Sequence, residues 1–352
     1  MIRVLLVDDS PIVLHILQGL LRRTSDIEVI GTATDGKQAL ALFPKLNPDV
    51  ICTDLHMPAM DGLEFTRTVM STQPRPILVI SVSVSSDSPN VFHLLEAGAI
   101  DVFLKPRDIL AVDQDKLAQS LASKIRIVAG VHVFRNNANI AAQMPLKTTK
   151  FPELQTKVPV KIVVIGASTG GPQALHTILG GLPKTFPIPI VCVQHIGANF
   201  LSELIRWLSE ASTLPIRQAN PGELPQGGVI YFAPGNSHLE LDELGCFSLS
   251  DGPICDGHRP SVTVSMRAAA KHYGSTAVGV LLTGMGRDGA TGLAEIAAAG
   301  GVTIAQNEAS CVVYGMPQTA VALGIVRHVL PLDLIAPALV SLSSGSYSTN
   351  NN

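Results

Sequence analysis

The chain has 352 residues, which is enough for two ordinary domains that each bury a core of their own. Hydrophobic residues make up 46% of it and charged residues only 15%, a balance that suits α/β domains whose parallel strands are covered on both faces. The formal net charge of −3 gives no electrostatic reason to expect nucleic acid or a membrane surface as a partner.

Targeting segments and disulfides are not expected. The first apolar run, residues 1–7, leads directly into Asp8 and Asp9, which leaves it too short for a signal peptide, and no later segment is long enough for a membrane span. The cysteines are odd in number, scattered and without paired metal-ligand spacing: Cys52, Cys192, Cys246, Cys255 and Cys311. We interpret them as reduced packing residues and expect a cytoplasmic protein of bacterial type, without membrane insertion.

Residues 1–125 alternate short apolar runs with amphipathic segments. The apolar runs predict strands at residues 4–7, 28–31, 50–53, 77–81 and 102–104. Ser10 and Pro11 predict the start of the first helix, because serine as N-cap followed by proline is typical of a helix N-terminus, and a last helix is expected near residues 113–128. Such alternation predicts a parallel, doubly wound sheet with its functional groups at the carboxyl ends of the strands.

Polar side chains follow four of these predicted strands. Asp8 and Asp9 come after the first strand, Asp54 after the third, Ser81 after the fourth and Lys105 after the fifth. Each taken singly is most simply a turn or cap residue, but four strand ends would have to agree by chance. Converging carboxylates offer the oxygen ligands that Mg²⁺ prefers, and the lysine and the serine are suited to pair with a phosphoryl group.

Three stretches resemble the receiver domain of response regulators: Val7-Asp8-Asp9-Ser10, Thr53-Asp54-Leu55-His56-Met57-Pro58-Ala59-Met60-Asp61-Gly62 and Leu104-Lys105-Pro106. The resemblance implies a flavodoxin-like fold in which Asp54 accepts the phosphoryl group and Asp8, Asp9 and Asp54 together hold Mg²⁺. It also implies that Ser81 is the switch hydroxyl, that Lys105 contacts the phosphate, and that a histidine kinase of the CheA type is the phosphodonor.

Three further details concern this receiver pattern. The resemblance implies a cis peptide bond between Lys105 and Pro106. His56 stands where the motif often has an acid, and Val82 follows the switch serine. These two departures concern the kinetics of switching and leave the assignment in place.

Periodicity ends after the last helix of this domain, and we assign residues 126–157 to a flexible linker. The segment contains Asn136-Asn137-Ala138-Asn139 and Lys147-Thr148-Thr149-Lys150, which have neither a strand pattern nor a helix pattern. A tether of this kind allows one domain to dock on another and to be released when a local charge changes.

A second strand-and-helix pattern occupies residues 158–345, and residues 346–352 are expected to be a disordered tail. Its apolar runs predict strands at residues 161–165, 188–193, 229–233, 277–283 and 302–305. A hairpin inserted among them is predicted from residues 239–241 and 246–249. The predicted fold is therefore α/β with two doubly wound domains, the second mainly parallel and carrying the hairpin.

Ser168, His195 and Asp288 follow the strand candidates of the second domain, so all three fall on the carboxyl edge of its sheet. Ser168 lies in a Gly-x-Ser-x-Gly turn between an apolar run and a helix start, a context that exposes a serine hydroxyl. An imidazole is suited to accept the hydroxyl proton, and a carboxylate to orient the imidazole. Considered singly, each residue has a simpler interpretation: the serine and the aspartate as helix caps, and the histidine as a hydrogen-bonded structural residue.

The flanking residues of these three resemble the catalytic domain of the CheB chemotaxis methylesterase family. The stretches that carry the resemblance are Ile165-Gly166-Ala167-Ser168-Thr169-Gly170-Gly171-Pro172, Val193-Gln194-His195-Ile196, Gly257-His258-Arg259-Pro260-Ser261-Val262 and Leu281-Leu282-Thr283-Gly284-Met285-Gly286-Arg287-Asp288-Gly289-Ala290. The resemblance implies that Ser168 is the nucleophile, His195 the base and Asp288 the orienting carboxylate. The implied reactions, which need no cofactor, are hydrolysis of glutamyl methyl esters on methyl-accepting chemoreceptors and deamidation of receptor glutamines.

Three further residues in these stretches are candidates for roles near the triad. The resemblance suggests the backbone N–H of Met285 as an oxyanion donor, which a glycine-rich loop would allow to approach closely. Thr169 and His258 are candidates for supporting or substrate-orienting groups. Arg287, directly before the predicted catalytic aspartate, departs from the commonest form of the motif.

The domain order suggests regulation, and two rival functions remain open. We expect the receiver to cover the active-site edge until Asp54 is phosphorylated. The first rival is a nucleotide-binding module, because a strand, a glycine-rich turn and a helix can cradle phosphates, although the Gly-x-Gly spacing is missing. The second is a noncatalytic adaptor that binds receptors under receiver control. Absence of a nucleotide-induced shift in melting would exclude the first rival, and methanol release would separate an enzyme from the second.

Overall fold

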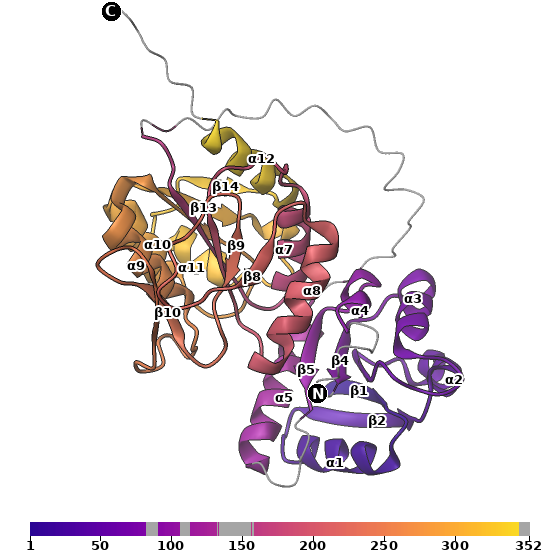
Figure 1. Cartoon of the computed structure of the whole chain (residues 1–352). Coiled ribbons are helices and arrows are strands. Elements are labelled where there is room, and N and C mark those ends of the chain that lie inside the picture. The colour runs from indigo at the N-terminus through magenta and orange to yellow at the C-terminus, as the bar shows by residue number, and fades with distance from the viewer. Residues whose placement is uncertain (82–90, 106–112, 132, 134–155, 157, 345–352) are drawn as a thin grey trace, which may run out of the picture. The chain divides into compact units, whose positions relative to one another are not determined.

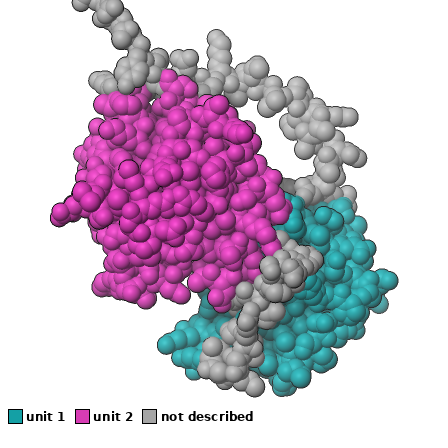
Figure 2. All heavy atoms as spheres, in the orientation of Figure 1, with its two compact units in different colours: residues 1–147 teal, residues 148–352 magenta. Residues whose placement is uncertain are grey.

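A computed structural model shows two compact units, residues 1–147 and 148–352 (Figures 1 and 2). The structure describes residues 1–81, 91–105, 113–131, 133, 156 and 158–344. Within these ranges no helix has both the length and the apolar character needed to cross a bilayer.

The first unit is built on a five-stranded sheet with the order β2-β1-β3-β4-β5, in which all neighbours are parallel. The strands are β1 (Ile2–Val7), β2 (Ile27–Ala33), β3 (Val50–Thr53), β4 (Ile77–Ser81) and β5 (Asp101–Leu104). This is the flavodoxin-like order of a doubly wound sheet. The order in which strands are added to the sheet reverses between β1 and β3, and these two strands carry Asp8 and Asp54 at their carboxyl ends.

Helices cover both faces of this sheet (Figure 1). They are α1 (Pro11–Leu21), α2 (Gly36–Leu46), α3 (Gly62–Thr72), α4 (His93–Glu96) and α5 (Gln114–Ala129). Helix α1 packs against α5, whereas α3 packs against both α2 and α4. Ser10 caps α1 as predicted, because its hydroxyl accepts a hydrogen bond from the Val13 backbone N–H at 3.4 Å and Pro11 opens the first turn.

Several predictions concern residues outside the described ranges. These are the cis bond between Lys105 and Pro106, the residue Val82, most of the linker and the tail at 346–352. Helix α5 ends at Ala129, so it continues past residue 126, where the linker is predicted to begin.

The second unit is built on a seven-stranded parallel sheet with the order β14-β13-β12-β6-β7-β9-β8. Its strands are β6 (Ile162–Ala167), β7 (Ile190–Gln194), β8 (Ile216–Gln218), β9 (Ile230–Phe232), β12 (Ala277–Leu281), β13 (Val302–Gln306) and β14 (His328–Leu330). The chain leaves β6 toward β7 on one side and later returns to β12 on the other. The switch point between β6 and β12 is where open α/β sheets place their ligands.

The helices of this unit form two groups that cover the sheet (Figure 1). They are α7 (Gly171–Gly180), α8 (Leu201–Ala211), α9 (Val262–Tyr273), α10 (Ala290–Ala298), α11 (Met316–Ala322) and α12 (Leu332–Ser343), with single 3₁₀ turns η1 (Ala198–Phe200), η2 (Gly274–Thr276) and η3 (Glu308–Ser310). Helix α7 packs against α8 and α12, and α10 packs against α9 and α11. All residues of β6, β7 and β12 are buried, as expected for central strands covered on both sides.

The predicted hairpin is present as β10 (His238–Leu241) and β11 (Phe247–Ser250). It forms a separate two-stranded antiparallel sheet that packs on α9, rather than extending the parallel sheet. All five cysteines are free; Cys52 and Cys192 are buried, and the other three are half-buried.

Candidate active site

The turn after β6 presents Ser168. Gly170 has φ of +76° and forms the N-cap of α7, a backbone conformation that glycine adopts without steric cost. The Ser168 carbonyl accepts a hydrogen bond from Gln194 Nε2 at 2.9 Å, and the Ser168 backbone N–H donates to the Thr283 carbonyl at 3.0 Å. The turn is therefore tied to the carboxyl ends of both neighbouring strands, and Ser168 itself is half-buried.

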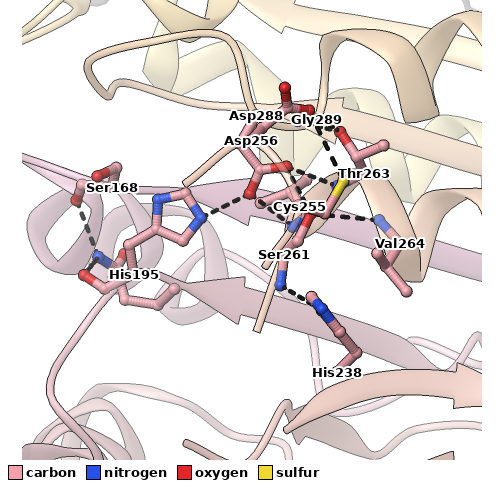
Figure 3. A network of polar contacts seen from close by, with 12 residues as sticks. Ser168, His195, His238, Cys255, Asp256, Ser261, Thr263, Val264, Asp288 and Gly289 are labelled. Carbon is pink, nitrogen blue, oxygen red and sulfur yellow. Dashed lines mark hydrogen bonds and ion pairs between the residues drawn. The ribbon is translucent and has the colours of Figure 1, made fainter. Parts of the chain in front are cut away.

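His195 follows β7, and its backbone N–H donates to the Ala167 carbonyl at 3.0 Å, so the backbones on either side of the site are joined. Its side chain is 7% exposed, and ring atom Nε2 lies 2.7 Å from Asp288 Oδ2. The ring lies between Ser168 and Asp288, with its other nitrogen on the side of Ser168 (Figure 3). That nitrogen, Nδ1, is buried without a hydrogen-bond partner among the described residues.

Asp288 is buried at the N-terminus of α9 (Figure 3). Its Oδ2 accepts from His195 Nε2 at 2.7 Å and from the Val262 backbone N–H at 2.8 Å. Its Oδ1 accepts from the Ser261 hydroxyl at 2.7 Å and from the Thr263 backbone N–H at 3.0 Å. Burial acts to raise the pKa of Asp288, but the hydrogen bonds and charge of His195, with those from Thr263 and Ser261, outweigh it and lower the pKa to about 2.

The protonation of Asp288 fixes the tautomer of His195. Because the carboxylate is ionised near neutral pH, it can only accept hydrogen bonds, so the proton of the neutral imidazole must be on Nε2. Nδ1 then carries a lone pair and faces the serine side. This arrangement reverses the usual one, in which the aspartate binds Nδ1 and Nε2 acts as the base.

A tight turn at Cys255–His258 packs on the imidazole. Asp256 and Gly257 have φ of 49° and 85°, and reciprocal backbone hydrogen bonds join Cys255 and His258. Positive φ at both central residues is typical of a type I′ turn, and Asp-Gly is a preferred sequence for it. The ring of His258 stacks on that of His195, with centroids 3.5 Å apart and planes inclined by 8°. His258 therefore restricts how the His195 ring can tilt.

The loop after β12 lies against the serine turn. Thr283 Oγ1 donates to the Thr169 carbonyl at 3.0 Å, and a Cβ built on Gly284 would lie 2.7 Å from Ser168 Cβ. The backbone N–H groups of Thr169 and Met285 have no acceptor among the described residues. Thr169 is buried, whereas Met285 is 52% exposed.

A second polar cluster lies at the carboxyl ends of β1, β3, β4 and β5 in the first unit. Lys105 Nζ lies 2.6 Å from Asp8 Oδ2 and 2.7 Å from Asp54 Oδ2. Asp8, Asp54 and Lys105 are buried, Ser81 is fully buried, and Asp9 is exposed. Burial raises the pKa of Asp8, although Lys105 acts in the opposite direction.

The carboxylates of this cluster fit a divalent metal ion by the chemistry of their donors. Ligand oxygens of Asp8, Asp9 and Asp54 all lie within 4.8 Å of one another. Three carboxylates provide hard oxygen ligands, and the exposure of Asp9 leaves one side open to solvent, as a site that binds Mg²⁺ together with a phosphodonor requires.

The sequence matches known families in both units. Residues 4–122 match the response regulator receiver domain, and residues 163–339 match CheB methylesterase. A protein-glutamate methylesterase/protein-glutamine glutaminase of Nitrosospira multiformis is 41% identical over 344 residues, covering 97% of this chain and 97% of the relative. The chain belongs to the CheB methylesterase family.

Two further similarities agree with this assignment. A protein-glutamate methylesterase/protein-glutamine glutaminase of Geobacter metallireducens is 41% identical over 347 residues, 97% of this chain and 99% of the relative. The crystal structure of the Thermotoga maritima CheB methylesterase catalytic domain is 41% identical, with a TM-score of 0.51, and it covers 53% of this chain and all of that one.

The structure also shows hydrogen bonds in this site from residues for which the sequence predicted no role. Ser261 and Thr263 hold Asp288, Gln194 holds the serine turn, and Asp256 accepts hydrogen bonds from Thr263 Oγ1 at 3.2 Å and Arg287 Nε at 2.9 Å. Serine before Val-Thr-Val is a recognisable N-cap pattern for Ser261. No local sequence pattern predicts the hydrogen bonds made by Gln194 and Asp256.

Proposed function

We propose that this CheB relative is a phosphorylation-regulated serine hydrolase that removes methyl esters from glutamyl side chains of chemoreceptors and deamidates receptor glutamines. One observation carries the proposal: the buried imidazole of His195 donates to the ionised Asp288 and turns its unprotonated nitrogen toward Ser168 (Figure 3). The names of the relatives supply the substrate class.

Acylation begins when His195 Nδ1 takes the proton of the Ser168 hydroxyl while Oγ attacks the ester carbonyl carbon. The carbonyl oxygen becomes an oxyanion, for which the free backbone N–H groups of Thr169 and Met285 are the candidate donors. The imidazolium that forms is stabilised by Asp288, which stays ionised because its pKa is about 2. Collapse of the intermediate expels methanol, which takes the proton from Nδ1.

Deacylation repeats these steps with water. His195 removes a proton from water, the hydroxide adds to the acyl carbon, and the glutamate side chain leaves as Ser168 recovers its proton. The same site would deamidate glutamine, because an amide carbonyl passes through the same acyl-enzyme and expels ammonia in place of methanol. A single constellation of residues therefore serves both reactions.

The proposal is tested by measuring methanol and ammonia release from a methylated receptor fragment by the full chain. Ser168→Ala should reduce both rates to background, because the attacking oxygen is gone. Ser209→Ala is a matched control, since its hydroxyl donates only to the Ile205 carbonyl within α8. Methanol release by Ser168→Ala at the wild-type rate would refute the nucleophile, whereas a wild-type chain that releases neither methanol nor ammonia would favour the adaptor alternative.

We further propose that the first unit accepts a phosphoryl group on Asp54 from a histidine kinase of the CheA type. Lys105, which already bridges Asp8 and Asp54, would pair with the new phosphate, and Ser81 would donate to it. Mg²⁺ held by Asp8, Asp9 and Asp54 would offset the repulsion between the aspartate and the incoming group. Binding of Mg²⁺ can be measured by titration calorimetry on wild type and Asp9→Asn.

Regulation and location complete the proposal. The layout is a receiver over residues 1–125, a linker over 126–157 and a methylesterase domain over 158–345. The receiver restrains the esterase until it is phosphorylated, and the enzyme acts in the cytoplasm, where the proposed kinase would meet it.

A further inference from the structure

The hydroxyl of Ser261 is completely buried and points at the carboxylate of Asp288. Its oxygen also accepts a hydrogen bond from the Val264 backbone N–H at 3.4 Å, as the N-cap of α9. Because a hydroxyl has a single hydrogen, accepting from the helix leaves that hydrogen for Asp288. Ser261 therefore joins the start of α9 to the acid of the triad.

Each oxygen of Asp288 has its own pair of donors. Oδ2 faces His195 and the Val262 backbone N–H, whereas Oδ1 is held by the Ser261 hydroxyl and the Thr263 backbone N–H. The donors on Oδ1 fix the rotation of the carboxylate about its terminal torsion, which is otherwise broad. That rotation decides whether Oδ2 is aligned with the imidazole.

Ser261 is itself held from the opposite side. Its backbone N–H donates to Nδ1 of the buried His238 at 3.2 Å, and Nε2 of His238 lies 3.0 Å from the Pro253 carbonyl. Since a carbonyl can only accept, the proton of His238 is on Nε2, and its Nδ1 is free to accept from Ser261. The backbone of residue 261 is thus held in place independently of the hydrogen bond between its side chain and Asp288.

We propose that Ser261 is a positioning residue for ester and amide hydrolysis: its hydroxyl sets the rotation of Asp288 and, through it, the orientation and tautomer of His195. Because Ser261 is fully buried, a bound substrate would not reach it, so its effect falls on the chemical step and not on binding. The inference rests on the proposed function for its kinetic readout but not for its spectroscopic one.

The experiment compares four variants of the full chain in methanol release from a methylated receptor fragment. Ser261→Ala removes the hydroxyl, and Ser261→Gly removes it with a smaller loss of helix capping than alanine causes. Ser261→Thr restores a hydroxyl. The control is Ser265→Ala, one turn along α9, whose buried hydroxyl donates at 2.7 Å to the Leu239 carbonyl and not to Asp288.

We expect Ser261→Ala and Ser261→Gly to lower kcat roughly tenfold to a hundredfold, the range for a hydrogen bond to a charged group, with KM within about twofold of wild type. Ser265→Ala should keep kcat within about threefold, and Ser261→Thr should recover most of the lost rate. If Ser261→Gly is folded and its kcat falls no further than that of Ser265→Ala, the positioning role is wrong. The glycine variant decides the matter if the alanine variant does not fold.

A second readout does not depend on substrate. In the full chain labelled with ¹⁵N-histidine, the proton on His195 Nε2 should resonate far downfield in wild type and Ser265→Ala. It does so because it lies in the hydrogen bond between Nε2 and Asp288 Oδ2, whose two atoms are 2.7 Å apart. It should move upfield or broaden in Ser261→Gly. An unchanged resonance there would overturn the inference. If wild type releases no methanol, the proposed function fails, and this resonance alone decides the role of Ser261.

Discussion

Replacing Asp288 by asparagine changes one atom of a carboxylate that accepts four hydrogen bonds. An asparagine has one acceptor oxygen, and its NH₂ group must face one of the two donor pairs. His195 and Ser261 can each adapt, the first by changing tautomer and the second by rotating its hydroxyl. The backbone N–H of either Val262 or Thr263 cannot adapt and loses its partner whichever way the amide is turned.

Two contributions set the size of the effect on stability. The pKa of Asp288 is lowered from 3.8 to about 2, which corresponds to about 2 kcal/mol of stability near neutral pH. Because the pKa is lowered on folding, this contribution is present above pH 4 and is lost as the pH falls toward 2, with about half gone by pH 3. An orphaned backbone N–H adds about 1–3 kcal/mol.

Urea unfolding of a fragment that begins at residue 159 measures this effect, since the corresponding region of the Thermotoga maritima relative was crystallised as a domain. We expect Asp288→Asn to lose about 3–5 kcal/mol of unfolding free energy at pH 7, and its difference from wild type to shrink by about 1 kcal/mol at pH 3. In the full chain, methanol release should fall by about 10⁴-fold, the loss found when a triad aspartate is so replaced, because the imidazole then takes the wrong tautomer.

Asp256→Asn is the matched control. Asp256 also lies at the start of α9 and binds Thr263 Oγ1, but it does not contact His195, and asparagine tolerates its φ of 49°. It should keep kcat within a few-fold of wild type. If the free energies of unfolding of wild type and Asp288→Asn differ by the same amount at pH 7 and pH 3, the lowered pKa of Asp288 is refuted. Near-normal methanol release by Asp288→Asn would refute the proposed role of Asp288 in orienting His195.

Three further outcomes are expected. Asp54→Asn should keep the basal rate of methanol release and lose its stimulation by acetyl phosphate; stimulation that survives would place the switch elsewhere. The fragment from residue 159 should exceed the unphosphorylated full chain in methanol release, and equal rates would show that the receiver does not restrain the esterase. Gly284→Ala should lower kcat about tenfold or more, because its methyl group would lie 2.7 Å from Ser168 Cβ and displace the proposed nucleophile; an unchanged kcat in a folded variant would show that the loop shifts to accommodate the methyl group.

Much of the fold follows from local sequence pattern. Central parallel strands such as β6 are apolar throughout because both of their faces are buried, and every such strand was predicted. The strands that escaped prediction, β8 and β14, lie at the two edges of the larger sheet and have three residues each. An edge strand pairs on one side only, so its sequence need not be apolar, and Ile216-Arg217-Gln218 carries little strand signal.

The part of the candidate site that lies at strand ends could be predicted from the sequence. The placement of Ser168, His195 and Asp288 on one edge follows from the parallel sheet, and the structure brings His195 and Asp288 into contact there. The support of Asp288 by Ser261 was not predictable, because it joins residues 27 positions apart through the packing of α9. Nor does any sequence pattern state which ring nitrogen of His195 faces the serine, since that depends on the direction from which the carboxylate approaches.

The reversed imidazole has a mechanical consequence. Nδ1 is bonded to the first ring atom beyond Cβ, whereas Nε2 lies at the far end of the ring, so a given rotation about the Cα–Cβ bond displaces Nδ1 less. The backbone of His195 is joined to Ala167, the residue before the serine, by a hydrogen bond of 3.0 Å. The position of Nδ1, the proposed proton acceptor, is therefore set mainly by the backbone at the ends of β6 and β7, because few bonds separate Nδ1 from that backbone.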